Sequence, residues 1–181
     1  LKLENIYLPK VREIGARVFS YTNLSSIELN SLVYAGTTKY NSADHGAQFH
    51  SCCQLKEVTM KSMPYIQIEM FYNCYNLSFI DAPQVNTISK NAFINCTSLS
   101  NLTFPSLNVI GEKAFEELPG LVDINLPSVT KISDYAFNSC PNLVSFSSEN
   151  CSFILNYVFN NCAKLENIYL PKVREIGARV F

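Results

Sequence analysis

Hydrophobic and polar positions alternate in a short segment that recurs along the whole chain. The segment reads Leu, two variable residues, Ile, one variable residue and Leu, and in the most regular copies Pro follows. Alternation with a period of two predicts a short strand whose apolar side chains point inward. Pro has no backbone N–H, so it is expected to end the pairing of that strand.

Each block continues with a second apolar pair, such as Val129 and Ile132, and closes with a phenylalanine. Where Gly follows that pair, as at Gly15, Gly111 and Gly177, we expect a turn with positive φ. The leading leucines are Leu3, Leu24, Leu55, Leu77, Leu99, Leu121, Leu143 and Leu165. The closing residues are Phe19, Phe49, Phe71, Phe93, Phe115, Phe137, Phe159 and Phe181.

From Leu55 onward both series advance in steps of 22 residues. A fixed period of this length indicates repeats that cannot bury their apolar faces alone and must stack on one another. We therefore predict a repeat solenoid, mainly β, of about eight 22-residue coils with a parallel strand face. Residues 1–181 form a single domain on this interpretation, and the phenylalanine rings stack from coil to coil.

The motif Leu-x-x-Ile-x-Leu-Pro-x-Val-x-x-Ile-Gly-x-x-Ala-Phe-x-x-Cys resembles the BspA-like leucine-rich repeat. Leu121 to Cys140 match nearly every position, and the resemblance extends over the entire chain. It implies a curved leucine-rich-repeat solenoid that is extracellular or at the cell surface and serves adhesion or protein binding. It implies no enzymatic activity and no cofactor.

Five of the seven cysteines occupy one position of the repeat, three residues after the phenylalanine: Cys52, Cys74, Cys96, Cys140 and Cys162. One block has Leu118 there instead, which indicates a buried position. Stacked coils are about 4.8 Å apart, less than most disulfides require between Cα atoms. We predict a row of buried free thiols, with disulfides or metal chemistry as alternatives.

The second block is longer than the others, and its surplus lies at about residues 37–46. This insertion holds His45, while His50 and Cys53 follow closely. One interpretation is a metal site formed by His45, His50 and Cys53, with Asp44 as a further ligand. The spacing fits no standard zinc signature, so the preferred interpretation is a surface loop that influences partner choice.

Two positions of each main strand point outward and form a candidate protein-binding face. Small polar residues mixed with aromatic ones are typical of adaptable contact surfaces. The alternative is that the face is polar only because it is solvated. The candidate residues are Asn5, Tyr7, Glu28, Glu57, Phe79, Asp81, Asn101, Asp123, Asn125, Asn167 and Tyr169.

Composition narrows the partners. Fourteen Lys and Arg residues balance fifteen Asp and Glu residues, which gives no electrostatic reason to expect nucleic acid. No apolar run in the sequence is long enough to span a membrane. No catalytic triad, paired carboxylates or glycine-rich phosphate loop is evident, so we expect neither an enzyme nor a cofactor.

Residues 2–19 and 164–181 are identical over all eighteen positions, at an offset of 162 residues. The intervening blocks share only the apolar pattern. The duplication suggests a 162-residue super-repeat, in which this chain is one unit plus the first coil of the next. Two function classes follow: an adhesion or ligand-binding array whose partner is a host or matrix protein, and a structural filament or stalk of tandem or end-to-end units.

Overall fold

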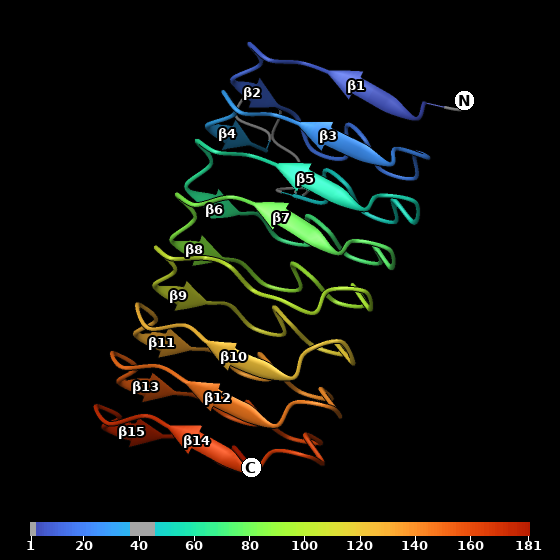
Figure 1. The fold of residues 1–181 in the computed structure, drawn as a ribbon. Coiled ribbons are helices and arrows are strands. Elements are labelled where there is room, and N and C mark those ends of the chain that lie inside the picture. Colours follow the sequence, from blue (N-terminus) through green and yellow to red (C-terminus); the bar gives the residue numbers. More distant parts are fainter. Residues whose placement is uncertain (1–2, 37–45) are drawn as a thin grey trace.

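The main strands lie along one side of a stack of coils, and seven of the coils each contribute one short strand to it (Figure 1). The computed structural model describes residues 3–36 and 46–181. The strands on this side are β1 (Asn5–Tyr7), β3 (Ser26–Glu28), β5 (Glu57–Thr59), β7 (Phe79–Asp81), β10 (Asp123–Asn125), β12 (Ser145–Ser147) and β14 (Asn167–Tyr169). Neighbours within each sheet pair in parallel, and equivalent residues of successive repeats face each other, as Ile6 faces Ile27. The predicted mainly β solenoid with parallel strands is confirmed.

A second line of two-residue strands runs beside the first, formed by the second apolar pair of each block. Its members are β2 (Glu13–Ile14), β4 (Tyr34–Ala35), β6 (Tyr65–Ile66), β8 (Thr87–Ile88), β9 (Val109–Ile110), β11 (Lys131–Ile132), β13 (Phe153–Ile154) and β15 (Glu175–Ile176). The sequence pattern indicated buried residues here but not a second sheet. The line divides into a pair, β2–β4, and six strands from β6 to β15, and the insertion lies between the two groups.

The third side of each coil is built from turns rather than strands. There the N–H group of each closing phenylalanine donates to the residue before the next phenylalanine, as Phe93 does to the Ala114 carbonyl at 2.9 Å. Residues on either side of the phenylalanine adopt positive φ, for example Asn91 at 58° and Asn95 at 61°. The turn backbone thereby directs its N–H groups along the stack, so this side also holds neighbouring coils together.

The expectation of positive φ at Gly15, Gly111 and Gly177 is wrong. Among the described glycines only Gly36 has positive φ, at 147°. The left-handed positions belong instead to non-glycine residues such as Arg17 and Lys113. Gly111 and Gly177 instead allow the backbone to approach the preceding coil closely. A Cβ on Gly177 would lie 2.6 Å from the Leu155 carbonyl carbon.

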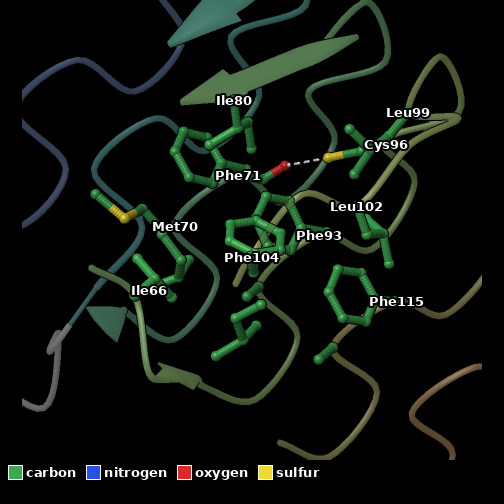
Figure 2. Packing of buried hydrophobic residues seen from close by; sticks show 14 of the residues in the cluster. Ile66, Met70, Phe71, Ile80, Phe93, Cys96, Leu99, Leu102, Phe104 and Phe115 are labelled. Atoms are coloured by element: carbon green, nitrogen blue, oxygen red, sulfur yellow. Dashed lines mark hydrogen bonds between the residues drawn. The ribbon is translucent and has the colours of Figure 1, made fainter. Parts of the chain in front are cut away.

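The core is a continuous apolar column inside the stack. All eight closing phenylalanines stack ring on ring, with centroid separations from 5.3 to 5.9 Å. The predicted ring column is therefore confirmed. Figure 2 shows the middle of this core, where Phe71, Phe93 and Phe115 lie among Ile66, Ile80 and Leu99. Each coil covers its neighbours, which is how short, individually unstable repeats bury enough surface to fold.

Candidate functional site

The main strand face carries the proposed binding residues. Tyr7, Glu28, Glu57, Phe79, Asn101, Asp123, Asn125, Asn167 and Tyr169 are exposed, and Asp81 is half-buried. The side chain of Asn5 lies outside the described part of the structure. Their placement follows from the strand pleat: Ile80 points into the core, so Phe79 and Asp81 on either side of it point outward.

These residues do not converge on one patch. Tyr7 lies in the first coil and Tyr169 in the last, seven coil steps away, which is about 34 Å if each coil rises about 4.8 Å. The polar members bond to their neighbours along the stack. Ser145 donates to Asp123 at 2.6 Å, Ser147 donates to Asn125 at 3.0 Å, and Lys61 lies 3.7 Å from Asp81. Phe79 lies near the middle of the strand face, and its apolar ring is 52% exposed.

The strand face is not continuous, contrary to the prediction of one strand per coil. The main line splits into a four-stranded sheet ending at β7 and a three-stranded sheet beginning at β10. Asn101 lies between them, in a segment without strand structure. The break coincides with Phe104, which occupies the position held by Ala82 in the preceding coil and Leu126 in the next. Its buried ring lies 6.2 Å from that of Phe93 and needs more room than Ala82 does.

A shallow hollow of about 330 Å³ accompanies the break. Leu102, Thr103, Phe104, Pro105, Asn125 and Pro127 line it, one coil beyond Phe79 on the same side of the solenoid. Sequence reasoning did not identify this feature. The available signal was the large aromatic at position 104, where neighbouring repeats have smaller aliphatic residues.

His50 projects on the turn side, next to the insertion. Its ring stacks on that of Tyr72 at 4.9 Å, and the Tyr21 ring packs on it at 5.6 Å with a tilt of 45°. Its Nδ1 lies 2.9 Å from the Ser51 hydroxyl. Burial lowers the pKa of His50, with the Glu69 carboxylate opposing and the Arg17 guanidinium adding to that effect. The imidazole thus fits the aromatic stack best in its neutral form.

Of the residues suggested as metal ligands, His50 and Cys53 fall within the described ranges 3–36 and 46–181. There, no group of three His, Cys, Asp or Glu side chains is arranged to hold a metal ion. His45 and Asp44 lie outside the described residues. The Cys53 thiol donates to the Ser51 carbonyl at 3.4 Å, whereas His50 Nδ1 contacts the Ser51 hydroxyl.

The cysteines of the repeat form the predicted row of free thiols. Each thiol donates to the carbonyl of the phenylalanine one coil earlier, as Cys96 does to Phe71 at 3.0 Å (Figure 2). The same contact joins Cys52 to Phe19, Cys74 to Phe49, Cys140 to Phe115 and Cys162 to Phe137. Burial raises the pKa of the Cys96 and Cys74 thiols, which favours the protonated, hydrogen-bond-donating form.

The stacked parallel coils with one short strand face define a leucine-rich-repeat solenoid. The chain belongs to the family described as BspA type leucine rich repeat region, which matches in six copies over residues 1–99 and 64–181. The family and its structural neighbours are in general non-enzymatic scaffolds. No curated protein matches the chain.

Three solved structures share the fold. A leucine-rich-repeat protein of T. pallidum is 24% identical, with a TM-score of 0.70. The match covers 86% of this chain and 73% of the T. pallidum chain. A leucine rich cell surface protein of Faecalibacterium prausnitzii is 25% identical, with a TM-score of 0.77, and the match covers 91% of this chain and 44% of that protein. A leucine-rich-repeat protein of Bacteroides ovatus is 22% identical, with a TM-score of 0.80, and the match covers 99% of this chain and 52% of that protein. This chain therefore spans about half of the latter two proteins. In its described residues, no helix could cross a bilayer.

Proposed function

We propose that this protein is a non-enzymatic cell-surface protein that binds another protein through the main strand face of its solenoid. Membership of the family and the likeness to a protein described as a leucine rich cell surface protein support the surface location. The partner class is a protein of a host surface or of the matrix around cells. Adhesion is the biological role that such binding serves.

The observation that carries the proposal is the exposed ring of Phe79 near the break in the strand face. Its side chain is 52% exposed, and the equivalent residues of the two adjacent coils, Glu57 and Asn101, are polar. Phe79 is therefore an apolar group in polar surroundings. Aromatic anchors surrounded by polar groups dominate the energetics of many protein interfaces. The hollow beside Phe104 and Pro105 offers a complementary apolar surface for a side chain of the partner.

The polar surroundings favour a protein over other partner classes. Asp123 and Asn125 are held by Ser145 and Ser147, which fixes their orientation before binding. Groups held in place lose less conformational entropy when a partner arrives. The chain has a formal net charge of −1, so no broad positive field is present to attract nucleic acid or anionic lipid.

A binding screen with matched variants tests the proposal. The purified chain is passed over immobilised matrix glycoproteins and over proteins extracted from host-cell surfaces, and captured partners are measured by surface plasmon resonance. Phe79→Ser is expected to weaken binding at least tenfold because it removes the central apolar contact. The matched control is Phe153→Ser, which removes an exposed ring from the second line of strands instead.

The two variants separate the binding face from general surface effects. If Phe153→Ser weakens binding as much as Phe79→Ser does, or if neither variant changes it, the strand face is not the binding surface. Circular dichroism at the same concentration verifies that both variants keep the fold, so a loss of binding reports on contact rather than on unfolding.

A further inference from the structure

The duplicated segment places the same coil in two different surroundings. Residues 2–19 are followed by another coil, and residues 164–181 are preceded by one. Equivalent residues in the two copies therefore report separately on the two sides of a single coil. Comparing them shows which side chains the following coil covers and which the preceding coil covers.

The following coil covers the isoleucine and the phenylalanine. Ile14 is 8% exposed and Phe19 is 5% exposed, whereas their equivalents Ile176 and Phe181 are 53% and 68% exposed. The preceding coil covers the valine, since Val18 is 51% exposed and Val180 only 3%. Each side chain is buried in one of the two copies, so a coil of this sequence with neighbours on both sides buries all three.

The first copy shows a native-like contact on the C-terminal side. The ring of Phe19 stacks on that of Phe49 at 5.3 Å, and the Phe19 N–H donates to the Gln48 carbonyl at 2.9 Å. Strands β1 and β2 pair with β3 and β4 in the regular parallel register. The Gly36 N–H also donates to the carbonyl of Ile14 at 2.9 Å.

The last copy shows an equally regular contact on the N-terminal side. Strands β14 and β15 pair with β12 and β13, and Phe181 stacks on Phe159 at 5.9 Å. Specific polar contacts add to this pairing. Lys172 donates to the Asn150 side chain at 2.7 Å, and the Ala178 N–H donates to the Asn156 side chain at 2.8 Å.

The side of the last coil that has no neighbour carries an open apolar hollow. Its volume is about 440 Å³, and its lining includes Leu165, Ile168 and Phe181. In the first copy the equivalents of these residues are Leu3, Ile6 and Phe19. There, Ile27 pairs with Ile6 and Phe49 stacks on Phe19, so the coil that starts at residue 20 already fits this surface.

We propose that residues 164–181 form a connecting coil whose C-terminal side accepts the coil beginning at residue 20 of a second copy of this unit. The junction between successive 162-residue units then adds no new break to either line of strands or to the phenylalanine column. This proposal concerns growth along the stack and does not depend on binding at the strand face. It gives the filament or stalk hypothesis a specific junction.

The experiment uses a double-unit chain, in which residues 1–181 are joined directly to a second copy of residues 20–181. Ile176→Asp is introduced either in the internal connecting coil or in the terminal one, which gives two variants of identical composition. The internal substitution buries a carboxylate at the junction and is expected to lower the thermal midpoint by more than about 5 °C. The terminal substitution lies on an exposed position and is expected to change it by less than about 1 °C.

Equal effects of the two substitutions would overturn the proposal, because the internal isoleucine would then be as exposed as the terminal one. Small-angle X-ray scattering gives a second test that needs no substitution. A continuous junction predicts one rod of about twice the length of the single chain. Scattering from two bodies joined flexibly, two separate unfolding transitions, or aggregation of the double-unit chain would each contradict a native-like junction.

Discussion

Gly111 lies so close to the preceding coil that a Cβ on it would be 2.7 Å from the carbonyl oxygen of Ile88. Its own N–H donates to that same carbonyl at 2.7 Å. The position therefore excludes a side chain because of the neighbouring backbone, not because of a turn. Gly15 occupies the same place in the first coil, where the nearest atom to such a Cβ is Val18 Cγ2 at 3.6 Å.

This difference predicts opposite results for one substitution at two equivalent sites. Gly111→Ala should destabilise the fold by about 1–3 kcal/mol, since the backbone of one coil must move. Gly15→Ala should be neutral or slightly stabilising, because alanine restricts the unfolded chain without a clash. Chemical denaturation of both variants measures this, and equal losses would contradict the close-approach explanation.

The phenylalanine column predicts a strong dependence on position. Phe93 is fully buried and stacks at 5.3 Å on Phe71 and at 5.4 Å on Phe115. Phe93→Ala should cost about 3–5 kcal/mol because it opens a cavity in the middle of the stack. Phe181→Ala, at the exposed end, should cost less than about 1 kcal/mol. Thermal unfolding measures both effects, and equal midpoints for the two variants would contradict a continuous column.

The His50 stack predicts a pH dependence of stability. Burial holds the folded-state pKa of His50 below its value in the unfolded chain. The unfolded state therefore takes up a proton first, and stability is lost as the pH falls through the unfolded pKa of about 6.5 toward the folded value. His50→Gln should make the midpoint less dependent on pH between about 7 and 5. An unchanged dependence would show that His50 does not contribute to it.

The buried thiols predict selective chemical modification. Burial raises the pKa of Cys74 and Cys96, so little thiolate is available there. Cys162 is only half-buried, so a reagent can reach its sulfur more readily. A thiol reagent at pH 8 should therefore modify Cys162 well before Cys74 or Cys96 in the native protein. Peptide mass spectrometry at short times gives the order, and early labelling of Cys96 would contradict its burial.

The sequence was sufficient to predict the repeat, the main strands and the phenylalanine column, because each depends on residues that recur at a fixed spacing. The row of thiols followed from Leu118 at the same position. The second line of strands was not predicted, since a two-residue strand leaves no alternation to detect. The left-handed turns were assigned to glycine, whereas ladder hydrogen bonds hold non-glycine residues such as Tyr135 in that conformation.

The candidate site was predicted only in part. Alternation in the strands correctly indicated which side chains face outward, such as Phe79. The break beside Phe104 depends on how one large ring fits against Phe93 in the preceding coil, and that is a three-dimensional packing relationship. The binding role of the face stays a prediction.

Site-specific photocrosslinking tests the binding face most directly. A photoreactive phenylalanine analogue replaces Phe79 in one preparation and Tyr21, an exposed aromatic on the turn side, in another. Both proteins are irradiated after binding to a partner captured in the screen. The account predicts a covalent adduct from position 79 and little from position 21. Equal adducts from both positions, or adducts from position 21 alone, would contradict binding through the strand face.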